Sequence, residues 1–281
     1  GPEPTVKNTE LPPAFYDNLD PEERERIKND LFLRTTYSPI KDDLNLYKNL
    51  TLDLEQNPPS LAFSRKLITS IEEHRSWAKK VIKQVKKLIH YQMESSIPQR
   101  IEFKEGPSTE FDNLILTKYY IKTTEFFTVP AILIRPKIID KPLPAIITVH
   151  GHNYGKINTL GMEKSSSNSY YGIELEKRGF ITLSLDQWGW GERRCQNGSK
   201  TEKDFEKIIT KSALLFGYTS VGIRTWEVSR CIDFLSQFDF VSDQFGVIGQ
   251  SGGGTTDAFS CVVEPRIQAA VISGYFCTWY D

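Results

Sequence analysis

Apolar and polar positions change their pattern near residue 100. From there on, short runs rich in β-branched residues alternate with stretches whose apolar positions recur at helical spacing, and such runs predict buried strands. The first two runs are separated by only a short polar stretch, which indicates an antiparallel pair. Strands that alternate with helices are typical of a parallel sheet covered on both faces. The runs lie at residues 114–123, 127–135, 145–149, 180–185, 245–248 and 269–273.

Residues 1–98 show a different pattern, mostly of helix and loop. Asp20 is followed by a proline and two glutamates, a capping-box arrangement that predicts a helix from there to Leu33. After a polar stretch with several prolines, apolar residues at helical spacing predict a long helix that ends near Gln92. Its lysines are expected to form a solvated outer face. The sequence therefore predicts a helical extension over 1–98 and an α/β core over 99–281.

Chemistry in a parallel sheet gathers in the loops beyond the carboxyl ends of the strands. The loop after the strand at 245–248 reads Gly-Gln-Ser-Gly-Gly and leads directly into a helix. A G-x-S-x-G sequence in that setting is typical of a nucleophile elbow, a tight turn that presents serine at a helix N-terminus. A glycine-rich turn that binds phosphate or only packs is the alternative, although the spacing of phosphate-binding loops is absent. We predict Ser251 as the nucleophile, in an elbow formed by Gly249, Gln250 and Gly253.

A second loop, after the strand at 145–149, begins with His-Gly-His. In a hydrolase with a nucleophile elbow, this loop and the residue after the nucleophile each supply a backbone N–H to an oxyanion hole. We therefore predict that the N–H groups of His152 and Gly252 receive the oxyanion. His150 is expected to hold its loop through a hydrogen bond and not to act as a base. The His152 side chain is a candidate for the pocket lining.

Four stretches carry a family resemblance, namely PAIITVHGHN at 144–153, GFITLSLDQWGWGERR at 179–194, RCIDFLSQFDFVSDQFGVIGQSGGG at 230–254 and PRIQAAVISGY at 265–275. In this order they resemble the α/β-hydrolase superfamily, and within it the branch of acetyl xylan esterases and dienelactone hydrolases. The resemblance implies serine-dependent hydrolysis of small carboxylic esters, acylated saccharides among them, with neither a metal nor an organic cofactor. It also implies that Asp186 contributes to the pocket wall. The aromatic residues of the same loop, Trp188 and Trp190, suggest a pocket surface that could stack on a sugar or an acyl group, and a packing role is an equally strong alternative.

The expected catalytic histidine is missing, because no histidine follows His152 in the chain. In α/β-hydrolases the acid and the histidine of the triad come after the nucleophile, and only about six of the family's eight strands are recognisable here. Neither Asp257 nor Asp281 is expected to be the triad acid. Serine without a base is a weak nucleophile. We therefore expect the 281-residue chain to be inactive, or nearly so, on its own.

Three explanations for the missing histidine remain open. The chain is an N-terminal fragment of a longer esterase, an inactive descendant used for binding, or a polypeptide whose partner supplies the last strands. Residues 277–281 are more typical of a domain interior than of a tail, which favours the first explanation. A serine peptidase of the prolyl oligopeptidase type is a further alternative for the function, although residues 1–98 do not supply the β-propeller expected there.

The apolar run at residues 269–273 is the last strand of the predicted sheet. A strand at the edge of a sheet carries unpaired backbone groups that another strand can bind. We therefore expect association with a second copy or a partner chain near Ala269–Ser273.

Composition changes this picture little. The 281 residues carry 35 Lys and Arg against 36 Asp and Glu, for a net charge of -1, which argues against binding to nucleic acid or to an anionic membrane. No apolar run reaches the roughly 18 residues that would span a membrane. The four cysteines are well separated, lack the spacing of metal ligands, and are expected to be mostly small buried thiols. Nothing in the sequence assigns a compartment.

Overall fold

The computed structural model of the chain separates two compact units, Gly1–Leu67 and Ile68–Asp281. The second unit contains a β-sheet and begins ahead of the boundary expected at residue 98. Most of the helix predicted from Asp20 to Leu33 lies outside the described residues. The structure describes residues 20–22, 52–53, 56, 61, 68–91, 100–152, 155–160, 171–194 and 202–275.

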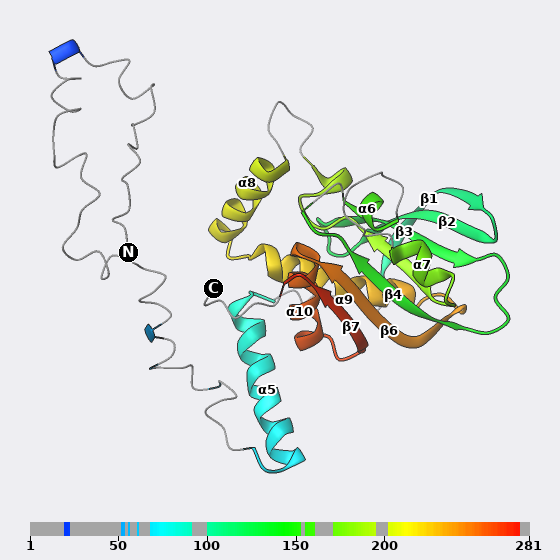
Figure 1. Cartoon of the computed structure of the whole chain (residues 1–281), viewed down its shortest axis with the longest axis horizontal. Coiled ribbons are helices and arrows are strands. Elements are labelled where there is room, and N and C mark those ends of the chain that lie inside the picture. The colour runs from blue at the N-terminus through cyan, green and yellow to red at the C-terminus, as the bar shows by residue number, and fades with distance from the viewer. Residues whose placement is uncertain are drawn as a thin grey trace, which may run out of the picture. The chain divides into compact units, whose positions relative to one another are not determined.

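A seven-stranded sheet forms the centre of the second unit (Figure 1). In chain order its strands are β1 (Glu102–Phe111), β2 (Leu114–Lys122), β3 (Thr128–Pro136), β4 (Leu143–Val149), β5 (Ile181–Leu185), β6 (Val241–Gln250) and β7 (Ile267–Ser273). Their order in space is β1-β2-β3-β5-β4-β6-β7. The strands from β1 to β5 in this order pair antiparallel, whereas β5, β4, β6 and β7 are parallel to one another. The predicted antiparallel entry into a parallel α/β sheet is therefore confirmed.

The hydrophobic pattern of the sequence does not predict β1. None of the ten residues of β1 is buried, and most of them are charged, small or polar. The strand pairs with β2, and the pairing shifts register between Glu105 and Ser108, across a Gly-Pro pair. A polar, irregular edge strand resists aggregation with other sheets, and it leaves no apolar alternation in the sequence to detect.

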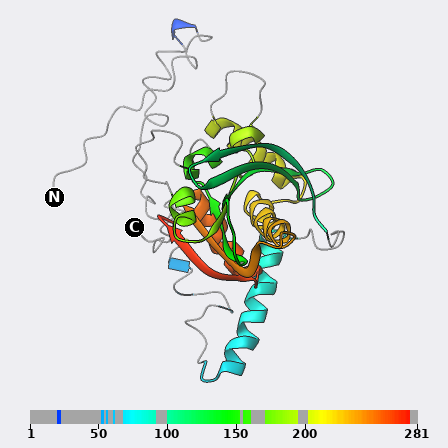
Figure 2. The same ribbon diagram turned by 90° about the vertical axis from the view of Figure 1, so that its right-hand side faces the viewer.

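Helices connect the parallel strands, and an additional helix precedes the sheet: α5 (Ile71–Leu88), α6 (Lys156–Leu160), α7 (Tyr171–Glu176), the 3-10 turn η3 (Gly191–Arg193), α8 (Glu202–Leu215), α9 (Ser220–Leu235) and α10 (Gly252–Val263). Local sequence explains their ends. Ser70 begins α5 by accepting a hydrogen bond from the N–H of Glu73, and Thr219 begins α9 through the N–H of Gly222. Gly179 follows α7 at a φ of 89°, the left-handed conformation expected at a helix end. Both views show α5 projecting away from the sheet (Figures 1 and 2).

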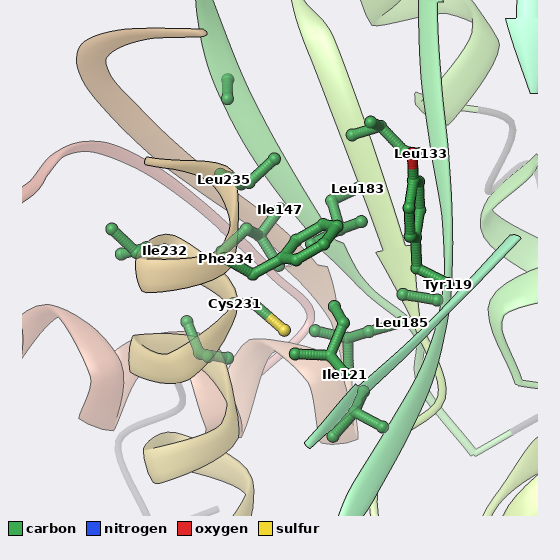
Figure 3. Packing of buried hydrophobic residues seen from close by; sticks show 14 of the residues in the cluster. Tyr119, Ile121, Leu133, Ile147, Leu183, Leu185, Cys231, Ile232, Phe234 and Leu235 are labelled. Atoms are coloured by element: carbon green, nitrogen blue, oxygen red, sulfur yellow. The ribbon is translucent and has the colours of Figure 1, made fainter. Parts of the chain in front are cut away.

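One face of the sheet packs against α9. Figure 3 shows Cys231 and Phe234 of this helix among Ile147, Leu183 and Leu185 of the central strands. All five side chains are at most 1% exposed. This cluster is the main hydrophobic core, and it holds the parallel strands in a fixed position beneath their carboxyl-end loops.

The opposite face of the sheet packs against α6 and α7. Alternate residues of a strand point to opposite faces, so Leu116 and Ile134 lie on the side away from α9. They form a second cluster with Leu160 of α6, against which Ile173 of α7 packs. Helices therefore cover both faces, as the alternation of strands and helices predicts.

Nearly every residue of α9 is buried, although the sequence predicts only one apolar face. The reason is a third cluster, in which Trp226 of α9 meets Ile89 at the end of α5 and Val263 of α10. The prediction of buried thiols is confirmed for Cys231 and wrong for Cys261, which is exposed on α10. The other two cysteines lie outside the described residues.

The strand β7 ends the sheet, and within the described residues it pairs only with β6. Five of its seven residues are exposed, among them Val271 with 55% of its surface accessible. The predicted apolar edge strand is therefore present. Its association with a second copy or a partner chain stays a prediction.

The register of the parallel strands brings three loops together. Val149, the last residue of β4, pairs with Leu185 at the end of β5 on one side and with Gly249 of β6 on the other. The loops after these three strands therefore begin side by side. They are the loops in which the sequence predicts the chemistry of the protein.

Candidate active site

Ser251 occupies the turn between β6 and α10 in a strained backbone conformation. Its φ of 51° and ψ of -116° lie outside the regions that residues with a side chain ordinarily adopt. Its N–H donates to the carbonyl oxygen of Ser273 at 2.8 Å, which ties the turn to β7. The residue is exposed, and within the described residues no hydrogen bond engages its hydroxyl. The elbow prediction requires this arrangement, a free hydroxyl at a helix N-terminus.

The glycines around the serine are required by close contacts between backbones. A Cβ atom on Gly253 would lie 2.2 Å from the carbonyl oxygen of Val149, and one on Gly249 would lie 2.5 Å from the carbonyl carbon of Gly253. The carbonyl oxygen of Gln250 similarly lies 2.9 Å from a Cβ placed on Gly151. Side chains do not approach backbone atoms this closely. Only glycine therefore lets α10 lie directly against the ends of β4 and β6.

His152 and Gly252, the two predicted oxyanion donors, lie against each other. Gly252 is the first residue of α10, so its N–H has no carbonyl one turn earlier to bind. No hydrogen bond within the described residues uses the backbone N–H of either residue. A Cβ on Gly252 would lie 2.8 Å from Cε1 of the His152 ring, which places this ring over the glycine. The structure thus brings the two donors together, and their catalytic role stays a prediction.

His150 is buried and links the three loops. In the neutral tautomer that satisfies both contacts, Nδ1–H donates to the Gly151 carbonyl oxygen (2.7 Å) and Nε2 accepts from the N–H of Gln187 (3.0 Å). The Gln187 amide donates back to the His150 carbonyl oxygen (2.5 Å) and accepts from Thr256 Oγ1 of α10 (2.6 Å). Burial lowers the pKa of His150 to about 4, so the ring is neutral near pH 7. The prediction that His150 holds its loop through a hydrogen bond is confirmed, and its engaged nitrogens leave no base for Ser251.

Asp186 does not line a pocket, in contrast to the expectation from the resemblance. Its side chain is fully buried and accepts hydrogen bonds from the backbone N–H and Nζ of Lys156 (2.8 and 2.5 Å) and from the N–H of Glu192 (3.0 Å). Lys156 Nζ also binds the Glu192 carboxylate. A Cβ on Gly191 would lie 2.1 Å from Asp186 Oδ1. The loops after β4 and β5 therefore fold around this carboxylate. Gly191, in the loop after β5, has no side chain and so leaves room for it.

Of the two tryptophans in the loop after β5, only Trp188 offers an open face. Trp190 is 2% exposed, and its ring lies edge-on to that of His152, with centroids 5.4 Å apart. Trp188 is partly exposed, with its ring centroid 6.2 Å from that of Phe127. Its carbonyl oxygen accepts a hydrogen bond from Arg224 at 3.1 Å, which fixes the loop. Trp188 therefore remains the candidate for the pocket wall.

A buried carboxyl group lies beneath the elbow. Asp257 of α10 is fully buried, and neither of its oxygens has a hydrogen-bond partner in the part of the chain that the structure describes. A Cβ on Gly249 would lie 2.5 Å from its Oδ2. Burial raises the pKa of Asp257 well above that of an ordinary carboxyl group. A fully enclosed carboxyl group without a hydrogen-bond partner among the described residues cannot orient a catalytic histidine, which agrees with the expectation that Asp257 is not the triad acid.

The raised pKa of Asp257 predicts how stability depends on pH. An unfolded chain releases this proton near pH 4 while the folded chain retains it, so above that pH each further unit favours unfolding by up to about 1.4 kcal/mol. Asp257→Asn has no proton to release, and its stability relative to the wild type should therefore increase as the pH rises. Urea unfolding of both proteins at about pH 5 and about pH 7 measures this difference. A difference that stays constant across this range would show that Asp257 is ionised in the folded state.

Other kinds of site are not evident in the described residues. Within them, no group of three or more His, Cys, Asp or Glu side chains could hold a metal ion. No helix among the same residues is both long and apolar enough to cross a membrane. The described site consists of one serine hydroxyl, two backbone N–H groups and the polar side chains that support their loops.

Three supporting side chains were not predicted from the sequence. Gln187 directly follows a buried strand and a buried aspartate, and this position is a usable signal for a polar link between loops. Lys156 and Glu206 lie in segments with no recognisable motif. Lys156 binds Asp186, 30 residues later. Glu206 binds Arg224, 18 residues later, and His152, far earlier in the chain. Only the folded structure reveals these contacts.

Comparisons with known proteins agree with this geometry. A profile of the abhydrolase family matches residues 45–281. The Bacillus subtilis (strain 168) protein YtaP, which is named as a hydrolase, is 29% identical over 147 residues, covering 50% of this chain and 46% of YtaP. A solved structure named as an acetyl xylan esterase from Bacteroides fragilis has a TM-score of 0.69 at 17% identity, covering 83% of this chain and 61% of that one. A glucuronoyl esterase from Solibacter usitatus has a TM-score of 0.52 at 15% identity, covering 78% of this chain and 64% of that one.

The chain covers only part of each of these proteins, and its likeness to the two esterases is a likeness of fold. The chain spans about half the length of YtaP and less than two thirds of each of the two esterases. Sequence identities of 15% and 17% establish a shared fold and leave the substrate open. The predicted resemblance to acetyl xylan esterases is therefore confirmed at the level of the fold.

Proposed function

The chain belongs to the abhydrolase family, and from this premise we propose that it acts as a serine-dependent hydrolase of carboxylic esters. The observation that carries the proposal is the exposed hydroxyl of Ser251, held at a φ of 51° at the N-terminus of α10. Two backbone N–H groups on adjoining loops, neither of which is engaged within the described part of the chain, support it. Hydrolysis of p-nitrophenyl acetate by the full-length natural protein and by its Ser251→Ala variant tests the proposal, and equal rates in the two proteins contradict it.

The proposed reaction proceeds through an acyl-serine. The Ser251 oxygen attacks the acyl carbon while its proton passes to a base, and the N–H groups of His152 and Gly252 receive the charge on the acyl oxygen. Collapse of this intermediate breaks the bond to the leaving alcohol, which takes up the proton. Water then attacks the acyl-serine by the same route, releases the acid and restores the serine.

We propose that neither His150 nor His152 is the base of this reaction. His150 has both ring nitrogens engaged. The His152 ring pairs through Nε2 with a carboxylate oxygen of Glu206 at 3.2 Å, and within the described residues it makes no hydrogen bond with Ser251. We propose that a histidine and an acid from outside this 281-residue sequence complete the triad, in the chain order that α/β-hydrolases use. The 281-residue chain alone should then hydrolyse esters about 10³-fold or more slowly than a form with the complete triad.

For the substrate, we propose a small acylated saccharide, in which the bond to be hydrolysed is the ester between the acyl group and the sugar. Two structural neighbours are named as acetyl xylan esterase and glucuronoyl esterase, and carbohydrate esters are the chemistry that these names share. Trp188 supports the proposal independently, because its partly exposed side chain stands in the loop after β5, which the hydrogen bond between Gln187 and Thr256 ties to the elbow helix α10. An exposed aromatic ring in such a place supplies apolar contact area for the face of a sugar.

This substrate class predicts a selective effect of Trp188→Ala. The variant should raise KM for an acetylated xylo-oligosaccharide about tenfold and change KM for p-nitrophenyl acetate by less than about twofold, because only the larger substrate reaches the ring. The contact of Arg224 with the Trp188 carbonyl oxygen is retained in the variant. Steady-state kinetics on both substrates measure the effect, and Trp188→Phe, which keeps an aromatic face, is the control. Equal changes in KM for both substrates would show that Trp188 is not part of a saccharide-binding surface.

A further inference from the structure

The His152 side chain connects both halves of the proposed oxyanion hole. Its own backbone supplies one N–H, and its ring covers Gly252, which supplies the other. Cβ placed on Gly252 would lie 2.8 Å from Cε1 and 2.9 Å from Nδ1 of the ring. The ring also lies edge-on to Trp190, at an interplanar angle of 86°. A rotation of this ring would therefore disturb the surroundings of both N–H groups.

Glu206 of α8 holds the ring in this position. One carboxylate oxygen lies 3.2 Å from Nε2 of His152, and the other lies 2.8 Å from Nη2 of Arg224. Arg224 is 7% exposed, and the same nitrogen reaches the carbonyl oxygen of Trp188 at 3.1 Å. Because Arg224 belongs to the buried helix α9, it fixes the carboxylate relative to the sheet. His152 is thereby connected to the core of the protein.

The charge of Glu206 also determines which nitrogen of the ring carries a proton. Burial alone would raise the pKa of Glu206, but its hydrogen bonds and charge interactions with His152 and Arg224 lower it to about 2. An ionised carboxylate only accepts hydrogen bonds, so the Nε2 atom of His152 must carry a proton towards it. This orientation turns Nδ1, the other ring nitrogen, towards Gly252.

A second ion pair in the same protein shows what a purely stabilising contact looks like. Arg193 and Glu227 form two parallel bonds of 2.8 and 2.6 Å, in which both carboxylate oxygens bind one guanidinium group. Such bidentate pairing is the favourable geometry for arginine with a carboxylate. Glu206 instead gives only one oxygen to Arg224, whose buried Nε has no partner within the described residues. The carboxylate is divided between the two side chains, and its second oxygen serves His152.

We propose that Glu206 is a positioning residue for ester hydrolysis. By holding the His152 ring against Gly252, it keeps the two oxyanion N–H groups in the geometry that the transition state requires. Glu206 acts through His152 and touches no part of the substrate. The inference rests on the proposed function, because it assigns Glu206 a part in that same reaction.

A double-mutant cycle between Glu206 and His152 tests the inference in the full-length protein. Glu206→Ala and His152→Ala should each lower kcat for p-nitrophenyl acetate about 10- to 100-fold with KM changed less than about twofold, because the oxyanion forms after the substrate binds. His152→Ala retains its backbone N–H, so the loss in that variant reports the ring alone. In the His152→Ala background, Glu206→Ala should have no further effect on kcat, because the side chain through which it acts is already absent. Glu206→Gln keeps a hydrogen-bond acceptor and should retain more activity than Glu206→Ala.

The controls separate this role from a loss of folding and from failure of the proposed function. Glu174→Ala removes an exposed glutamate that pairs with Lys177 and Arg178 of its own segment, and it should leave kcat unchanged. Thermal unfolding of each variant identifies the folded proteins that are compared. The inference is overturned if folded Glu206→Ala keeps the wild-type kcat, or if its effect is as large without His152 as with it. Absence of Ser251-dependent hydrolysis in the wild-type protein would instead overturn the proposed function, and the inference with it.

Discussion

Ser251→Ala is expected to lower kcat/KM for p-nitrophenyl acetate by about 10⁴- to 10⁶-fold in the full-length protein. The substitution removes the atom that forms the acyl intermediate and leaves its surroundings in place. The side chain is exposed, and within the described residues its hydroxyl makes no hydrogen bond. The folded structure should therefore change little, and the melting temperature should stay within about 2 °C of the wild type. Steady-state hydrolysis and thermal unfolding measure the two quantities.

A second serine provides the matched control for this loss. Ser236 lies at the end of α9, away from the elbow, where its hydroxyl donates to the Ile232 carbonyl oxygen at 2.8 Å. Ser236→Ala should keep the wild-type rate. If Ser251→Ala also keeps the wild-type rate, hydrolysis does not pass through Ser251. If the variant leaves the protein's biological activity untouched, the elbow is a remnant in a protein that acts by binding.

Gly253→Ala is expected to destabilise the fold by about 2–4 kcal/mol. The added Cβ would lie 2.2 Å from the carbonyl oxygen of Val149 and 2.7 Å from that of His150. Both oxygens belong to the backbone at the carboxyl end of the central strand β4, so α10 must move away from the sheet to relieve the clash. Urea unfolding should show a lower midpoint, whereas the dependence of the unfolding free energy on urea concentration should be unchanged, because unfolding exposes the same amount of surface in both proteins. Ester hydrolysis should fall as well, since the same helix carries Ser251 at its N-terminus.

A substitution at a glycine outside the elbow is the control that shows whether the loss of stability in Gly253→Ala arises from the close contact. Gly106 lies in the exposed strand β1, where a Cβ would meet its nearest neighbours at 3.4 Å, an ordinary contact distance. Gly106→Ala should change stability by less than about 0.5 kcal/mol. If Gly253→Ala is as stable as Gly106→Ala, α10 does not lie against β4 as described.

The parts of the fold that the sequence predicts are those in which a short segment carries the whole signal. The six predicted strands occur because each contains an apolar run of strand length, such as Ile181–Leu185, all of whose residues are buried. The elbow is predictable for the same reason. The strained turn at Ser251 needs glycines at fixed neighbouring positions, and these are visible in five consecutive letters.

Features that depend on contacts between distant segments were not predictable in the same way. Asp186 follows a strand end and thus resembles a pocket residue, but its carboxylate is occupied by Lys156, 30 residues earlier in the chain. Glu206 lies in α8 without any motif around it, and its position beside His152 follows from how α8 and α9 pack. The edge strand β1 carries no hydrophobic pattern, because its pairing relies on backbone hydrogen bonds that most polar sequences can make.

The central claim, that Ser251 is an activated nucleophile, is tested most directly by a fluorophosphonate probe. This reagent phosphonylates a serine whose hydroxyl is activated and whose oxyanion hole is formed. Full-length protein is incubated with the probe, digested and mapped by mass spectrometry, with Ser251→Ala treated in parallel. A single adduct on Ser251, absent from the variant, is the predicted result. A folded protein that hydrolyses esters but carries its adduct on another residue, or carries none, would contradict the claim.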